Sequence, residues 1–484
     1  MKKIETDVVV VAAGLSGLAA AATAAECGAR VVAFEKSSAV GGAASMGLGP
    51  FAVGTKHQRS QLIDIDVERA FKMFMEYTHW RVDANLVRRY FENSADTIVW
   101  LEDMGVEFAG AFRYFPKAEA TWHIVAGDKG TPGRNGGANM TKAMLEYAKA
   151  CGVEFYLETP AVSIQKDGDG AVCGVIARGA DGEEIEASCK AAVICTGGAG
   201  DNPQMIKERM GYTFQEDMFN FAIPGLKGDG ISMAYEAGAM QTAMSIEMIY
   251  VLPNCFMVAE NVQAVLKQPN LIVNQNGARF IDEEQVQNTT FTGNAISIQR
   301  GSAGYPILDT SILRGYIRNG PDVGNAVQSE ESVEDFDEVI SQMIEQGNPD
   351  VFKADSIREL AKMLGIDPDA LETTVDEYNG MCVTGDTKFF KRRKYMKPIV
   401  RAPFYAGKFR PGGYGTLGGI KINEYAEVLD KSWKPIPGLF AAGTDTCSIY
   451  GDSYMFLLPG NTMGYCLNTG RFAGESAAQF AAVT

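Results

Sequence analysis

The sequence predicts an α/β fold that opens with a strand, a glycine-containing turn, a helix and a second strand. Residues 7 to 11 read DVVVV, a short β-branched run, and residues 12 to 17 read AAGLSG. A helix of small residues, LAAAATAAEC, follows and stops at Gly28, and the second strand, RVVAFEK, carries Glu35 near its end. Short apolar strands that alternate with helices are typical of a parallel sheet covered on both faces.

Composition and charge narrow the class of protein. The 484 residues are 46% apolar and 21% charged, enough for a sizeable core and two or three domains. The net charge of −16 opposes binding to nucleic acid or anionic lipid. The apolar stretches fall short of the roughly 18 residues of a membrane span, and the N-terminus, MKKIETDVVVV, does not read as a secretory signal. We therefore expect a cytoplasmic protein without a membrane span.

The nine cysteines show no CxxC, haem-attachment or paired zinc spacing, so we predict no metal site. They are expected to be reduced, mostly structural thiols. The sequence has three histidines, His57, His79 and His123, all in the first third of the chain.

The first turn has the residues that a dinucleotide-binding βαβ unit requires. Gly14 lets the backbone approach a pyrophosphate at the helix N-terminus, and Gly17 allows close packing of helix and strand. Glu35, at the end of the second strand, can hold a ribose hydroxyl. One position departs from the GxGxxG pattern, because Ala12 stands where the first glycine is expected. The turn must therefore accommodate a methyl group.

Three later segments favour a flavin as the dinucleotide. Lys36 leads to Gly41-Gly42 and small residues as far as Ser45. An apolar strand ends in TGG at 196–198, and a second, IPGLFAAGTDT, reaches Gly443 and precedes a helix start, GNTMG, at 460–464. The free N–H groups of such a helix start would stabilise the negative charge of a reduced flavin ring.

With these segments, the chain resembles the flavoprotein subunits of fumarate reductase and succinate dehydrogenase, and soluble relatives such as urocanate reductases and ketosteroid dehydrogenases. The likeness covers nearly the whole chain and includes five further collinear segments, at 228–239, 276–284, 357–379, 402–423 and 470–478. It implies an α/β fold: a Rossmann-like FAD-binding domain of the fumarate reductase type, residues 1–245 and 400–484. An inserted α+β capping domain, residues 246–399, would bind substrate.

The resemblance also implies the cofactor contacts. Val162 would lie near the adenine. The FAD would be non-covalent, because the stretch GGAASMGLGPF lacks the histidine that carries the covalent bond in membrane-bound relatives. The predicted cofactor-binding residues are Ala13, Gly14, Ser16, Gly17, Glu35, Lys36, Gly41, Gly42, Ala43, Ala44, Ser45, Val162, Thr196, Gly197, Asp229, Gly443, Thr444, Asp445, Asn461, Thr462 and Met463.

The active-site motifs of the family are altered. Fumarate-type enzymes clamp a dicarboxylate with histidines and arginines, because buried carboxylates need cationic partners. In this chain the family's histidine pair falls on Tyr414 and Gly415, and the proton-donating arginine falls on Gln287. A further histidine falls on Tyr450, and the substrate-binding arginine falls on Tyr454.

The histidine expected before Pro253 is also missing, with Tyr250 or Leu252 nearest. Each tyrosine could line the site or be a half-buried core residue, but four together favour an aromatic site. The apolar insertion at 455–459, MFLLP, adds to this surface. The matched cap residues Arg279 and Glu283 are open to two readings, a role in catalysis or a salt bridge that holds the cap.

These replacements predict an FAD-dependent reductase that passes hydride from flavin N5 to a small, neutral, aromatic substrate and not to a dicarboxylate. Tyr414 or Tyr454 would supply the proton. Resemblance to soluble polyphenol reductases of gut anaerobes makes tetrahydrodaidzein, reduced to equol, the candidate substrate. Two alternatives stay open: a ketosteroid-type dehydrogenase or reductase, and a flavin electron-transfer module that needs a partner protein. A non-flavin NAD dehydrogenase is disfavoured. No second nucleotide fingerprint identifies the external electron donor.

Overall fold

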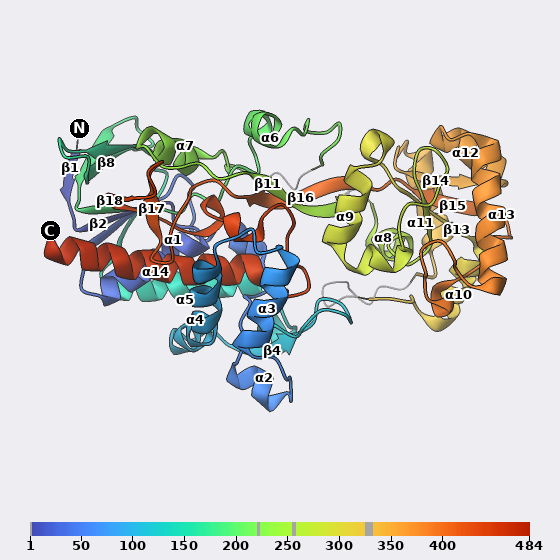
Figure 1. The fold of residues 1–484 in the computed structure, drawn as a ribbon, viewed down its shortest axis with the longest axis horizontal. Helices are drawn as coiled ribbons and strands as arrows, with labels where there is room; N and C mark the ends of the chain where they lie inside the picture. Colours follow the sequence, from blue (N-terminus) through green and yellow to red (C-terminus); the bar gives the residue numbers. More distant parts are fainter. Residues whose placement is uncertain (1, 220–222, 254–257, 325–332) are drawn as a thin grey trace. The chain divides into compact units, whose positions relative to one another are not determined.

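The computed structural model describes residues 2–219, 223–253, 258–324 and 333–484 (Figure 1). The chain divides into two compact units. The first comprises Met1–Gly211, Ala222–Glu247 and Gly415–Thr484, and the second comprises Tyr212–Phe221 and Met248–Tyr414.

A six-stranded sheet, ordered β17-β18-β10-β2-β3-β6, forms the centre of the first unit. The strands from β18 to β6 are parallel, and β17 is antiparallel to β18. All four residues of β2 are buried valines, as expected for a strand covered on both faces. The predicted parallel sheet is thus confirmed. Its strands are β2 (Val8–Val11), β3 (Val31–Phe34), β6 (Glu154–Tyr156), β10 (Ala191–Ile194), β17 (Glu427–Leu429) and β18 (Pro435–Ala441).

Two helices rich in small residues, α1 (Leu15–Glu26) and α14 (Asn461–Val483), run side by side in this unit (Figure 1). Their backbones approach closely at two glycines of α14. A Cβ on Gly470 would lie 2.4 Å from the Ser16 carbonyl oxygen, and one on Gly474 would lie 2.3 Å from that of Ala20. Larger residues at these positions would force the helices apart.

Further elements complete the first unit. A second sheet has the order β1-β9-β8-β7, and β4 pairs with β5 in a hairpin. The strands are β1 (Lys2–Glu5), β4 (Phe108–Phe112), β5 (Trp122–Val125), β7 (Ala161–Lys166), β8 (Val172–Arg178) and β9 (Glu184–Ser188). The helices are α2 (Lys56–Ser60), α3 (Val67–Tyr77), α4 (Ala84–Asp103), α5 (Gly136–Ala150), α6 (Pro203–Met210) and α7 (Asp229–Glu236).

The second unit is an α+β structure with its own apolar core. Its antiparallel sheet has the order β12-β13-β15-β14, and the core includes Ile272, Ile307 and Phe336. The strands are β12 (Leu271–Val273), β13 (Tyr305–Asp309), β14 (Val351–Ala354) and β15 (Phe404–Gly407). The helices are α8 (Glu260–Leu266), α9 (Thr289–Ser297), α10 (Thr310–Asn319), α11 (Phe336–Glu345), α12 (Ile357–Leu364) and α13 (Pro368–Thr384).

Two strands that pair with each other, β11 (Ser245–Val251) and β16 (Arg410–Leu417), each begin in one unit and end in the other. The division differs from the expected domain boundaries at two places. Residues 400–414 cluster with the second unit because β15 pairs with β13 and β14. The segment Tyr212–Phe221 joins them, since Phe219 N donates to the Pro411 carbonyl (2.9 Å).

Within the described parts of the chain, none of the helices combines the length and the apolar composition of a membrane span.

Candidate functional site

The turn between β2 and α1 is built around Ala12 and Glu35. Ala12 has a φ of 77°, in the left-handed region that glycine adopts more easily. One carboxylate oxygen of Glu35 accepts from Ala13 N (2.8 Å), and the other accepts from Ser37 N (2.8 Å). The acid predicted to face a ribose therefore also fixes the turn that precedes the helix.

Gly14 leaves an open space at the start of α1. It is the N-cap residue of the helix and provides no side-chain cap. A Cβ built there would meet no atom of the described residues within 4 Å, apart from the adjoining backbone. A Cβ on Gly17, in contrast, would lie 2.0 Å from the Ala12 carbonyl oxygen. The uncapped N–H groups of a helix start are a natural site for phosphate.

The double glycine lies beside this turn. Gly41 N donates to the Ala13 carbonyl (2.9 Å), and Gly41 forms an isolated bridge with Gly14. Gly41 and Gly42 have φ values of 100° and 52°, and Gly42 begins the 3-10 helix η1 (Gly42–Met46). The structure thus places the predicted stretch from Gly41 to Ser45 against the predicted pyrophosphate turn.

Asp445 holds the loop that follows β10. It lies in the 3-10 helix η7 (Gly443–Asp445), after β18, and β18 and β10 are adjacent parallel strands that end at the same edge of the sheet. Its carboxylate accepts from Gly198 N (2.8 Å), Gly197 N (3.2 Å) and both the N and Oγ1 of Thr196. Burial raises the pKa of Asp445, and the donors of the loop oppose that rise.

Other predicted cofactor residues occupy separate places. A Cβ on Gly443 would lie 2.5 Å from Ser16 Oγ, which records close packing of η7 on α1. Lys36 forms an ion pair with Asp229 (2.6 Å), and it also donates to the Gly225 carbonyl. Val162 lies at an irregular position in β7 and is 38% exposed.

The start of α14 meets two buried polar side chains, Tyr454 and Glu247. Thr462 N donates to Tyr454 Oη (3.0 Å). Thr462 Oγ1 lies 3.0 Å from Tyr454 Oη and donates to Glu247 Oε1 (3.0 Å). The predicted residues Thr462 and Tyr454 are therefore in direct contact.

Four buried tyrosines, Tyr90, Tyr450, Tyr454 and Tyr465, form what we term the tyrosine cluster. The ring centroid of Tyr450 lies 5.0 Å from that of Tyr454 and 6.1 Å from that of Tyr465. Tyr90 Oη donates to Asn461 Oδ1 (3.1 Å). Burial raises the pKa of all four phenols, so they stay protonated near neutral pH.

Tyr450 has the unusual hydroxyl of this cluster. Its side chain is fully buried, yet its Oη has no hydrogen-bond partner among the residues that the structure describes. A buried hydroxyl without a partner is costly. We therefore take this hydroxyl as a candidate contact to a ligand.

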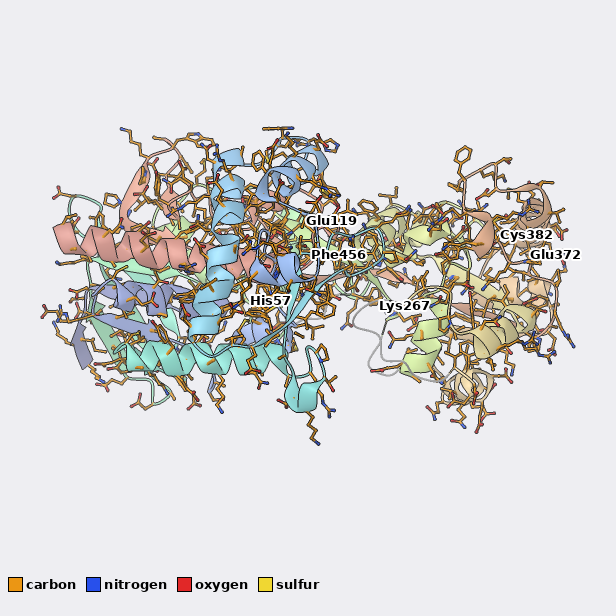
Figure 2. All side chains as sticks on the ribbon, turned by 90° about the horizontal axis from the view of Figure 1, so that it is seen from below. His57, Glu119, Lys267, Glu372, Cys382 and Phe456 are labelled. Carbon is orange, nitrogen blue, oxygen red and sulfur yellow. The ribbon has the colours of Figure 1, made fainter. Side chains whose placement is uncertain are left out.

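The apolar insertion packs next to the cluster. The Phe456 ring centroid lies 5.2 Å from that of Tyr454 and 4.8 Å from that of Tyr114. Figure 2 labels Phe456 close to Glu119, whose N donates to the Leu457 carbonyl (2.9 Å). The insertion is buried in the first unit and extends the aromatic surface around Tyr454.

Glu247 is the residue that sequence reasoning missed. It lies on β11, is 6% exposed, and its pKa is raised to about 7, chiefly by burial. Across the described ranges of the chain, no lysine or arginine pairs with Glu247 or bonds to the tyrosine cluster. The available signal was a single acid within the otherwise apolar strand SIEMIYV.

The second unit holds the remaining predicted residues. Tyr414 is 41% exposed, and Gln287 Nε2 donates to the Glu284 carbonyl (3.3 Å). The ring of Tyr250 packs on Phe409 in this unit's core, and its hydroxyl donates to the Val286 carbonyl (2.9 Å). That Tyr250 lines the site stays a prediction.

Arg279 and Glu283 form a buried salt bridge within the same unit. Arg279 Nη2 lies 2.7 Å from Glu283 Oε2 and 2.8 Å from Asp386 Oδ2, with all three side chains almost fully buried. Of the two readings of this pair, the geometry favours the structural one.

Comparison with known proteins gives the family. The FAD binding domain family matches residues 7–462. Vinyl phenol reductase of Lactiplantibacillus plantarum is 33% identical over 98% of this chain and 96% of its own length. Urocanate reductase of Eggerthella lenta is 30% identical over 99% of this chain and 75% of its own length. The open conformation of a flavocytochrome c3 fumarate reductase matches with a TM-score of 0.72 at 28% identity, over 99% of this chain and 79% of that one.

The chain belongs to the FAD binding domain family and is an FAD-dependent oxidoreductase with the fumarate reductase-type fold. The first unit fits this cofactor. The open space at Gly14, beside the uncapped start of α1, can take a pyrophosphate, and Glu35 is placed to accept from a ribose hydroxyl. The start of α14, at Asn461, is also without a side-chain cap.

Proposed function

We propose that this oxidoreductase reduces a neutral phenolic substrate and discriminates against dicarboxylates. The observation that carries the proposal is the tyrosine cluster, in which the buried Tyr450 hydroxyl has no partner among the described residues and Tyr454 contacts the start of α14. Phenolic rings and hydroxyls suit an aromatic ligand that carries its own hydroxyl groups. The similarity to vinyl phenol reductase supports the same substrate class.

The charge of the cluster opposes anionic substrates. Each carboxylate buried without a cationic partner costs several kcal/mol. Neither Glu247 nor the four tyrosines has a cationic partner in the described parts of the chain. A dicarboxylate bound here would face Glu247, a second acid, and would gain nothing to offset its lost hydration.

The chemistry divides between cofactor and protein. Bound and reduced FAD supplies a hydride from N5. Tyr454 acts as the general acid and donates its hydroxyl proton to the substrate. Tyr450 donates a hydrogen bond to the phenolic oxygen of the substrate, and the surrounding rings exclude water. Tyr414 and Gln287, predicted from the family motifs, remain further candidates for contact with the substrate.

We propose tetrahydrodaidzein, reduced to equol, as the specific reaction. Tyr454 would protonate the benzylic hydroxyl, which leaves as water while the ring's own phenolic proton is released, and the product is a quinone methide. A hydride supplied by the reduced cofactor would convert it to a phenolate, which regains the released proton. The net change is replacement of a hydroxyl group by hydrogen, with release of water. We further propose that the FAD is non-covalent, because residues 41–51 contain no histidine.

The test uses photoreduced holoenzyme without oxygen. It is mixed in turn with tetrahydrodaidzein, a vinyl phenol, a steroid ketone, urocanate and fumarate, and flavin reoxidation is followed by absorbance. We expect rapid reoxidation by a phenolic compound and none by fumarate. Fumarate turnover would reject the proposal, reoxidation by the steroid ketone alone would favour a ketosteroid-type enzyme, and reoxidation only by a partner protein would favour an electron-transfer module.

Two variants test the assigned tyrosines. Tyr454→Phe removes the proton donor, so the reoxidation rate should fall by a factor on the order of 100. Tyr450→Phe should instead weaken binding of the phenolic substrate. Tyr316→Phe, which removes a buried hydroxyl bonded to Asn270 in the second unit, is the matched control and should leave reoxidation unchanged. An unchanged rate in Tyr454→Phe would exclude its role as the acid.

A further inference from the structure

We propose that Glu247 is the proton reservoir of this site, a positioning residue that acts through Thr462 to set the direction in which Tyr454 donates its proton. The inference rests on the proposed role of Tyr454 as the general acid. Its structural basis is the hydrogen-bonded series Glu247, Thr462 and Tyr454, whose three side chains all lie in the first unit.

The geometry makes the three groups a single hydrogen-bonded chain. Thr462 Oγ1 lies 3.0 Å from Glu247 Oε1 on one side and 3.0 Å from Tyr454 Oη on the other. A threonine hydroxyl has one proton, so it can donate in only one of these directions at a time. Its second contact must then be one in which it accepts.

Two arrangements of protons follow. When Glu247 is ionised, it can only accept, so Thr462 donates to it and Tyr454 donates to Thr462. When Glu247 is protonated, it donates to Thr462, and Thr462 donates to Tyr454. Only in this second arrangement is the Tyr454 proton directed away from Thr462 and available to a ligand. Thr462 N donates to Tyr454 Oη in both.

Of the three hydrogen-bonded side chains, Glu247 is the one whose charge changes near neutral pH. The titratable groups that interact with it are neutral thiols and phenols, whose pKa values are all raised by burial: Cys447, Tyr450, Tyr454 and Cys466. Asp445, a second buried acid that interacts with Cys447 and Cys466, is bonded instead to the loop at 196–198. Burial raises the pKa of Glu247 to about 7, so both of its forms are populated at that pH.

The proton balance of the relay is complete. Tyr454 gives its proton to the substrate and takes the Thr462 hydroxyl proton. Thr462 takes the Glu247 proton, and Glu247 is left as a carboxylate that regains a proton from solvent before the next turnover. No electron moves in this relay. The same glutamate therefore makes proton delivery dependent on pH, although Tyr454 itself stays a neutral phenol.

Three variants test the relay, with flavin loading and the unfolding midpoint measured for each. In wild-type holoenzyme we expect substrate-dependent reoxidation to fall as pH rises through about 7. Glu247→Gln can still hydrogen-bond to Thr462 but supplies no proton, so the rate should drop on the order of 100-fold and this pH step should vanish. Thr462→Val should break the hydrogen-bonded chain with a similar loss, whereas Thr462→Ser, which keeps the hydroxyl, should restore the pH step.

A second readout needs no substrate. Infrared spectra of the FAD-loaded protein should show a carboxylic acid C=O band that disappears as pH rises through about 7 and is missing in Glu247→Gln. A wild-type pH profile in Glu247→Gln, or an acid band that titrates at the ordinary pH of an exposed glutamate, would overturn the relay. If wild-type protein reduces no phenolic substrate, the proposed function fails, and the infrared titration still decides the protonation of Glu247.

Discussion

The carbonyl oxygen of Ala12 occupies the space that a side chain on Gly17 would need: a Cβ built on Gly17 would lie 2.0 Å from that oxygen. The approach follows from the backbone of the turn, in which Ala12 adopts a φ of 77° and Ala13 N donates to Glu35. The turn is thus held on one side by its close contact with the helix at Gly17 and on the other by its hydrogen bond to Glu35. Gly14, three residues earlier on the same helix start, faces open space.

The two glycines should respond differently to the same substitution. Gly17→Ala should lower the free energy of unfolding by about 2–3 kcal/mol, because the methyl group overlaps backbone. Gly14→Ala, at a φ of −69°, should leave the free protein's stability almost unchanged but weaken FAD binding, since its methyl group would enter the space assigned to the pyrophosphate. Urea unfolding of apoprotein and FAD titration measure the two effects. Unchanged FAD affinity in Gly14→Ala would contradict the assignment of this space.

Replacing Ala12 by glycine should relieve strain in the turn. We expect Ala12→Gly to raise the free energy of unfolding by roughly 0.5–1 kcal/mol, because an L-residue with a left-handed φ costs more than glycine there. Ala13→Gly is the matched control. Ala13 has no positive φ, so glycine should destabilise that position. Destabilisation by both variants would argue against strain at Ala12.

Asp445 should stabilise the loop at 196–198, whose backbone N–H groups donate to its carboxylate. Asp445→Asn turns one acceptor oxygen into a donor that faces backbone N–H groups, and should lower the free energy of unfolding by about 1–3 kcal/mol. FAD affinity should fall with it. The exposed Asp452→Asn serves as the control in the same denaturant titrations, and an equal effect of the two variants would exclude a special role for Asp445.

Glu247 should make stability depend on pH in a defined window. Its pKa rises from 4.5 in the unfolded chain to about 7 in the fold, so between these values the folded protein holds a proton that the unfolded chain has released. Its contribution is full below pH 4.5 and is lost as pH rises through 7, a change of ~3 kcal/mol. Wild type and Glu247→Gln should therefore match near pH 4.5, diverge as pH rises to about 7 and stay a constant amount apart above it, where the variant is more stable. Parallel stability curves across this range would contradict the raised pKa.

His123 should change the pH dependence of stability in the direction opposite to Glu247: stability should fall as the pH falls. It is buried, with Nε2 2.7 Å from Thr55 Oγ1, and burial lowers its pKa from 6.5 to about 4. The unfolded chain binds the proton first, so stability should be lost as pH falls from 6.5 through 4, by ~3 kcal/mol in all. Chemical unfolding of His123→Gln at pH 7 and pH 5 should show a smaller loss than wild type, whereas the exposed His79→Gln should follow wild type.

The sequence was most informative where the residues required by the fold and by the cofactor are the same and lie close together in the chain. Gly14, Gly17 and Glu35 are close in sequence, and local backbone geometry suffices to predict their roles. The tyrosines show the limit of motif reading. Tyr450 and Tyr454 pack together in the first unit, whereas Tyr250 packs on Phe409 in the second and donates to a backbone carbonyl, a difference that their motif positions do not show.

By itself, the sequence determined the βαβ start, the parallel sheet and the membership of a flavoprotein family. These properties depend on residue type and short spacing, which the linear chain displays directly. Only the tertiary structure decided that the Tyr450 hydroxyl has no hydrogen-bond partner within the described part of the chain. It also decided that Glu247 reaches Tyr454 through Thr462, which lies 215 residues from Glu247 in the sequence. Such facts depend on burial and on contacts between distant segments, and the order of residues does not fix those contacts until the chain has folded.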